Sequence, residues 1–75
     1  MAETFLTRAG YEKMRQDIEE LKKRKSQLSH DIADAREKGD LSENAEYHSA
    51  KDKLAEVLNR INILQDKLQG AKLID

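Results

Sequence analysis

Two acidic residues, Asp40 and Glu43, stand three positions apart in the segment KGDLSENAEY, residues 38–47. On a first helical turn this spacing sets both side chains on one side of the chain. Carboxylates are the hard oxygen ligands that Mg²⁺ prefers, and two of them can complete the shell of a weakly held ion. In a two-metal site, a second ion orients or ionises the water that attacks a phosphodiester. The pair is therefore a candidate for metal-assisted hydrolysis.

The same two acids also fit ordinary helix capping. Asp40-x-x-Glu43 resembles a capping box with aspartate as the cap, and acidic residues are favoured in the first turn of a helix. The spacing by itself is compatible with both interpretations, and a capping role does not prevent a functional one.

Composition limits where such chemistry can occur. The chain has 75 residues, of which 39% are charged and 4% aromatic, with no proline or cysteine. This is one small domain without a large core, a disulfide framework or a glycine-rich phosphate loop. Two packed helices offer no pocket that excludes water. If the acids do chemistry, we expect them to do it inside a cavity of another molecule.

Charge and hydropathy also restrict the class of protein. No apolar run approaches the ~20 residues of a membrane span, and the N-terminus lacks the layout of a signal peptide. The formal net charge of −1 predicts no bulk attraction to nucleic acid or to an acidic membrane. We expect a cytoplasmic, highly helical protein.

Apolar residues recur at spacings of three and four in two segments, which is the a/d rhythm of a coiled coil. The first seam comprises Tyr11, Met14, Ile18, Leu21, Lys25, Leu28, Ile32 and Ala35, and the second comprises Tyr47, Ala50, Leu54, Val57, Ile61, Leu64, Leu68 and Ala71. Fifteen of the sixteen positions are apolar or tyrosine, whereas the 37% apolar composition predicts about six. Lys25 is the exception, and its alkyl stem can lie on the seam while its ammonium reaches water.

The two seams are mirror images about residue 41, so an antiparallel hairpin stacks all eight layers in register. A parallel pair would need a long return connection, which the sequence lacks. The predicted fold is all-α, an antiparallel two-helix coiled-coil hairpin with its apex near Leu41. We expect one domain over residues 1–75, with a helix over about 8–38, a tip at 39–43 and a second helix over about 44–70.

End signals agree with this hairpin. Thr7 suits an N-cap, and Gly39 suits the left-handed residue that closes the first helix. At ~1.5 Å per residue the first helix is about 45 Å long, which makes a thin arm with the acidic segment at its far end. At the opposite end, Phe5, Leu6, Leu73 and Ile74 collect more apolar surface than the seam needs.

Basic residues gather midway along the arm. This basic collar comprises Lys22, Lys23, Arg24, Lys25 and Arg60. It carries no aromatic residue for base stacking, so a solvated helix face is one interpretation and a contact with RNA phosphates is another.

The tip segment resembles a known family. GDLSENAEY, flanked by AREK (35–38) and HSA (48–50), is similar to the tip of the GreA family of bacterial transcript cleavage (elongation) factors. The resemblance extends over essentially the whole chain, from LTRAG (6–10) to AKLID (71–75), and matches the N-terminal coiled-coil domain. It implies a second, C-terminal globular domain that this sequence does not include.

The resemblance also implies a function. Family members insert the coiled coil into the secondary channel of RNA polymerase and stimulate the polymerase's own Mg²⁺-dependent hydrolysis of RNA in backtracked elongation complexes. They are not enzymes themselves, since they supply acidic residues to the polymerase active site. The implied partners are bacterial RNA polymerase and the nascent RNA 3′ end, and the implied cofactor is Mg²⁺ held jointly with the polymerase. The basic collar can then follow the extruded RNA.

Residue roles follow by position in the motif. Asp40 is implied in metal contact, and Glu43 in ordering the water or assisting the metal. Around this pair, the residues implied in supporting the tip are Ser42, Asn44, Glu46 and Tyr47, the last two by bracing the apex against the first helix.

Three alternatives stay open. A structural or interaction hairpin would tolerate replacement of Asp40 and Glu43. A nucleic-acid-binding arm would bind free RNA in a salt-dependent way. A related channel-binding factor with an altered tip would inhibit the polymerase, although the presence of both acids favours the cleavage branch.

Overall fold

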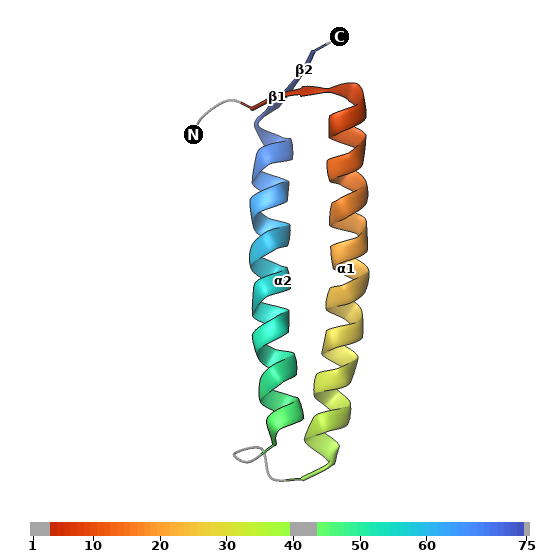
Figure 1. The fold of residues 1–75 in the computed structure, drawn as a ribbon, viewed down its shortest axis with the longest axis vertical. Helices are drawn as coiled ribbons and strands as arrows, with labels where there is room; N and C mark the ends of the chain where they lie inside the picture. The colour runs from red at the N-terminus through yellow and green to blue at the C-terminus, as the bar shows by residue number, and fades with distance from the viewer. Residues whose placement is uncertain (1–3, 40–43, 75) are drawn as a thin grey trace.

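The computed structural model describes residues 4–39 and 44–74, which form two long helices lying side by side (Figure 1). In chain order the elements are β1 (Thr4–Thr7), α1 (Arg8–Glu37), α2 (Ala45–Gln69) and β2 (Ala71–Ile74). The helices are antiparallel, and the molecule measures 54 × 21 × 13 Å. The predicted all-α antiparallel hairpin is confirmed. Its expected apex, Leu41, lies outside the described residues.

The core is the predicted seam. Every buried side chain in ranges 4–39 and 44–74 is a seam residue: Ile18, Leu28, Ala35, Ala50, Val57 and Ile61. Leu28, Val57 and Ile61 form the central cluster, with Leu21 and Leu54 packed against it. Lys25 is the one seam residue that is exposed, as expected for a charge next to this cluster.

Helix α1 begins at a side-chain cap. Thr7 has extended backbone angles, and its hydroxyl oxygen Oγ1 accepts a hydrogen bond of 3.0 Å from the backbone N–H of Gly10. This bond satisfies one of the N–H groups that a helix start leaves without a partner. The predicted N-cap at Thr7 is confirmed.

A short parallel β-pair, which the sequence did not predict, lies at the base of the hairpin. Strand β1 pairs with β2 in the register Thr4↔Ala71 to Thr7↔Ile74. The two strands directly precede α1 and follow α2, so the antiparallel helices bring them to the same end (Figure 1). Phe5, Leu73 and Ile74 stay exposed there, at 60%, 51% and 49% of their surface.

Candidate functional site

The site is the end of the hairpin opposite the β-pair, where α1 stops. Lys38 is the C-cap of α1, and its backbone N–H donates to the Ala35 carbonyl oxygen over 3.2 Å. Gly39 follows with φ 133°, a backbone region that strains any residue with a side chain. A Cβ at Gly39 would meet nothing within 4 Å, so backbone conformation and not space requires glycine. The chain thus leaves α1 through a turn that needs this residue.

Helix α2 begins at Asn44. The side-chain oxygen Oδ1 of Asn44 accepts a hydrogen bond of 3.0 Å from the backbone N–H of Tyr47, which makes Asn44 the N-cap. The capping interpretation of the acids concerns Asp40 and Glu43, which lie outside the described residues; the N-cap that the structure gives α2 is Asn44. Asparagine is as good a cap as aspartate, and here its amide oxygen reaches the third N–H of the helix.

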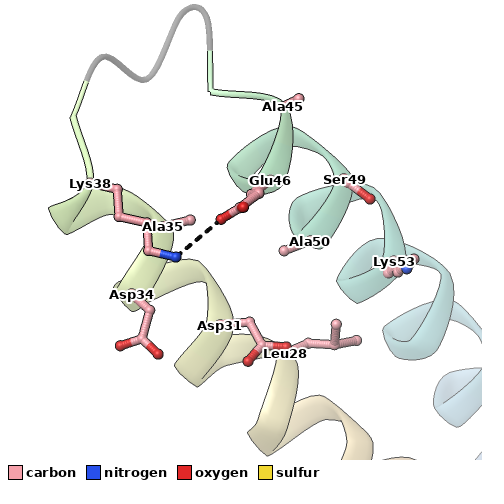
Figure 2. A pocket seen from close by; sticks show the side chains of 10 residues that line it. All are labelled: Leu28, Asp31, Asp34, Ala35, Lys38, Ala45, Glu46, Ser49, Ala50 and Lys53. Atoms are coloured by element: carbon pink, nitrogen blue, oxygen red, sulfur yellow. Dashed lines mark hydrogen bonds and ion pairs between the residues drawn. The ribbon is translucent and has the colours of Figure 1, made fainter.

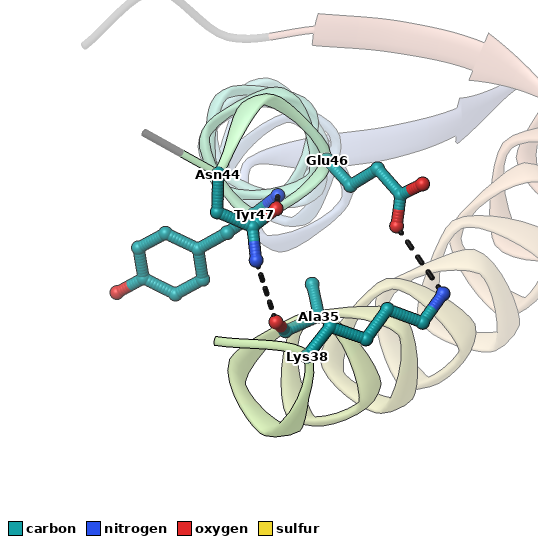
Figure 3. A network of polar contacts seen from close by, with 5 residues as sticks. All are labelled: Ala35, Lys38, Asn44, Glu46 and Tyr47. Carbon is teal, nitrogen blue, oxygen red and sulfur yellow. Dashed lines mark hydrogen bonds and ion pairs between the residues drawn. The ribbon is translucent and has the colours of Figure 1, made fainter. Parts of the chain in front are cut away.

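The amide nitrogen of Asn44 makes a second contact, across to α1. Nδ2 donates to the Ala35 carbonyl oxygen over 2.6 Å, in a partly buried position (Figure 3). This carbonyl belongs to the last turn of α1, where helix carbonyls lose their partners within the helix. Since the Ala35 carbonyl also accepts from the Lys38 N–H, Asn44 caps the start of α2 and adds a second hydrogen bond to an acceptor at the end of α1.

A salt bridge joins the same two helix ends. Lys38 Nζ lies 3.4 Å from Glu46 Oε2, and both side chains are mostly exposed (Figure 3). The ammonium of Lys51 lies 5.2 Å from the ring centroid of Tyr47, which is a half-buried seam residue. A cation at this distance from a ring is attracted to its π face.

An open groove runs behind the tip between α1 and α2 (Figure 2). Its charged lining comes from both helices and has both signs: Asp31, Asp34, Lys38, Glu46 and Lys53. Ala35 and Ala50 contribute its small apolar side chains. Within ranges 4–39 and 44–74, no three His, Cys, Asp or Glu side chains are grouped so as to hold a metal ion.

The predicted acidic pair and Ser42 fall in residues 40–43, outside the described residues. The end of α1 and the start of α2, which precede and follow these residues in the chain, lie at the end of the hairpin opposite the β-pair (Figure 1). Of the other predicted supporting residues, Asn44 is the N-cap of α2, and Glu46 and Tyr47 lie in its first turn.

Four of the five residues of the basic collar line two separate grooves, and Lys23 lines neither. The arginine groove is lined by Asp17, Glu20, Leu21, Arg24, Arg60 and Leu64. The lysine groove is lined by Lys22, Lys25, Ser26, Ser29, Leu58, Ile61, Asn62 and Gln65. Arg24 directly precedes the seam residue Lys25, and Lys22 directly follows the seam residue Leu21. The two grooves therefore run along opposite sides of the seam. The collar is therefore not one continuous patch.

Comparison with known proteins assigns this hairpin to a class. The family model described as "Transcription elongation factor, N-terminal" matches residues 4–73. "Transcription elongation factor GreA" of Thermotoga neapolitana is 45% identical over 76 residues, covering 100% of this chain and 49% of its own length. The GreA proteins of Nitratiruptor sp. and Rickettsia felis are 44% and 45% identical, covering 93% of this chain and 43% and 44% of their own lengths.

The slender antiparallel hairpin and these matches define the N-terminal domain of a transcription elongation factor. The chain belongs to the GreA/GreB family. It spans about half the length of the curated relatives it matches, at 43–49% of each. Neither helix, over the described residues, combines the length and the apolar character of a membrane-spanning segment.

Proposed function

We propose that this chain is the part of a transcript cleavage factor that enters the secondary channel of bacterial RNA polymerase. There it stimulates the polymerase's own hydrolysis of RNA in backtracked elongation complexes. The chain is not itself an enzyme. The observation that carries the proposal is membership of the GreA/GreB family over residues 4–73, in a hairpin with the matching tip sequence at one end.

The shape of the molecule supports this function. A channel can be entered by an arm 54 Å long and only 21 × 13 Å across. The arm holds its shape through the seam, with the central cluster of Leu28, Val57 and Ile61 midway along it. At the free end, Asn44 and the Lys38–Glu46 salt bridge join the two helices directly behind residues 40–43.

Asp40 and Glu43 are the residues that we propose to act in the polymerase active site. Their two carboxylates suit Mg²⁺, which takes about six oxygen ligands. Two carboxylates provide only a share of this shell, so the polymerase, RNA and water must complete it. When bound at such a site, Mg²⁺ stabilises negative charge and helps to activate a water molecule. In this proposal Asp40 contacts the metal, and Glu43 orders the water or assists the metal.

The assignment of the α2 cap to Asn44 adds support. Because Asn44 already satisfies the N–H of Tyr47, α2 does not need Asp40 as its N-cap. The proposed role of the two acids therefore does not compete with the capping of α2.

A contact between the nascent RNA and the basic collar is part of the proposal. The lysine groove suits phosphates better than the arginine groove, because Lys22 and Lys25 share their groove with uncharged residues only. In the arginine groove, Asp17 and Glu20 lie among the lining residues and oppose an anion.

The test is RNA cleavage in a halted, backtracked bacterial polymerase complex with Mg²⁺. The chain is added at high concentration, beside a variant carrying Asp40→Asn and Glu43→Gln. A matched control carries Asp52→Asn and Glu56→Gln, which makes the same two chemical changes at exposed positions of α2. We expect cleavage with the parent and the control, and at least about a hundredfold less with the tip variant.

Two results would contradict the proposal. Equal cleavage with the tip variant would remove Asp40 and Glu43 from the chemistry. Absence of cleavage with the parent, while crosslinking places it in the channel, would favour a structural or inhibitory hairpin.

A further inference from the structure

The side-chain amide of Asn44 forms hydrogen bonds with both helices, through its oxygen and through its nitrogen. Oδ1 accepts from the N–H of Tyr47 in α2, and Nδ2 donates to the carbonyl oxygen of Ala35 in α1 (Figure 3). Serine, threonine or aspartate could provide the first bond as a helix cap. An ionised aspartate has no donor for the second bond, and serine or threonine has a single hydroxyl, one bond nearer to the backbone than Nδ2, in place of the separate oxygen and nitrogen of the amide. The paired contacts therefore select asparagine in particular.

The contact between Asn44 and Ala35 is a short one between the end of α1 and the start of α2. Its donor–acceptor distance of 2.6 Å lies at the short limit for an N–H···O bond. Two of the three seam residues at this end, Ala35 and Ala50, are alanines, and they are only 3% and 8% exposed. Small side chains let two helices approach closely, and the approach brings the short asparagine side chain within reach of α1.

The contact also lies at a critical place in the chain. Asn44 directly follows Glu43, and the Ala35 carbonyl also accepts from Lys38, two residues before Asp40. The hydrogen bond from Asn44 thus joins the chain just before and just after residues 40–43. The neighbouring Lys38–Glu46 salt bridge is exposed and 3.4 Å long, so it restrains these two chain ends less strongly.

We infer that Asn44 is a positioning residue that fixes the separation of the two helix ends and thereby the placement of Asp40 and Glu43. This inference rests on the proposed function for its effect on cleavage. Displacing a reacting group by about 1 Å can slow a reaction by up to a hundredfold. Loss of the bond to Ala35 should therefore lower the maximal cleavage rate, while the rest of the arm still binds the channel.

The key variant is Asn44→Ser, which keeps a capping oxygen for Tyr47 and replaces the amide donor to Ala35 with a hydroxyl one bond nearer to the backbone. We expect its maximal cleavage rate to fall between about tenfold and a hundredfold. The concentration that gives half-maximal stimulation should change less than about twofold. Thermal stability should stay close to the parent value because serine is a comparable cap. The matched control is Asn59→Ser, at an exposed position in the middle of α2.

A second measurement tests the geometry without the polymerase. The chain contains no cysteine, so Glu37→Cys and Asp52→Cys place spin labels on exposed positions of α1 and α2 only. We expect a narrow distance distribution in the parent and in Asn59→Ser, and a broader one in Asn44→Ser. A narrow distribution in Asn44→Ser would overturn the inference, as would cleavage at the parent rate. If the parent itself fails to stimulate cleavage, the proposed function fails, and the distance distributions alone then decide whether Asn44 fixes the helix ends.

Discussion

Lys38 Nζ lies 3.4 Å from Glu46 Oε2, which joins the C-cap of α1 to the first turn of α2. Both side chains are more than half exposed, at 66% and 71%, so water screens the attraction. In a double-mutant cycle with Lys38→Gln and Glu46→Gln, we expect a coupling of about 0.2–1 kcal/mol in the free energy of unfolding. Urea denaturation measures it.

The same coupling should be almost abolished at about 1 M NaCl, where the Debye length is only ~3 Å. A coupling that is unchanged by salt would show that the two side chains interact by packing instead of charge.

The central cluster is the place where buried apolar side chains of α1 and α2 pack together. Leu28 is 6% exposed and contacts residues of both helices, so Leu28→Ala should cost about 2–5 kcal/mol. In so small a hairpin this loss unfolds much of the population, which circular dichroism at the helix band detects. Leu58→Ala, at a side chain that is 39% exposed, is the control and should cost much less. Equal losses would mean that the seam is not the main source of stability.

Lys25 interrupts the seam beside the central cluster. A polar residue at such a position lowers stability while it specifies register and oligomeric state. We expect Lys25→Leu to raise the free energy of unfolding by about 1 kcal/mol, because additional apolar surface is buried between the helices. Sedimentation equilibrium should accompany the denaturation curves, since the additional apolar side chain can promote self-association. A less stable monomer would contradict this account.

The start of α1 depends on one hydroxyl group. Thr7→Ala removes the hydrogen bond to the Gly10 N–H and should cost about 1 kcal/mol, with a range of ~0.5–2. Thr7→Ser keeps the oxygen and should stay within a few tenths of a kcal/mol of the parent. Thermal unfolding of the three proteins provides the comparison, and similar losses in both variants would place the role of Thr7 in the β-pair instead.

The two grooves of the basic collar permit a charge-matched comparison. One variant carries Lys22→Gln and Lys25→Gln from the lysine groove, and the other carries Arg24→Gln and Arg60→Gln from the arginine groove. If RNA follows the lysine groove, only the first variant should weaken binding of a single-stranded RNA. The plot of log affinity against log salt concentration should also become less steep for this variant, by about 1.4, since each lost phosphate contact removes ~0.7 from the magnitude of the slope. Equal effects would indicate non-specific attraction.

The choice of cap for α2 illustrates what sequence reasoning can and cannot rank. Asp40, Ser42 and Asn44 are all good N-cap residues, and each precedes the second helix within a few positions. Only the structure shows that Asn44 has partners for both its oxygen and its nitrogen. The contact with Ala35 depends on how closely the two helices approach, which no local pattern records.

The basic collar illustrates a second limit. Adjacent residues in the sequence, such as Arg24 and Lys25, differ in direction by about 100° around a helix, so a run of charges does not form one surface. The seam marks which residues face inward. The partner helix then decides that Arg24 shares a groove with Arg60, whereas Lys25 shares one with Leu58.

By itself, the sequence determined the hairpin, its antiparallel register and its buried positions, because a/d spacing dictates which side of each helix must leave water. It also determined the Thr7 cap, which is a short-range contact. The tertiary structure alone decided the parallel pairing of β1 with β2 and the contact of Asn44 with Ala35. These features join segments that are distant along the chain or lie on different helices, and they form only after the seam has brought the helices together.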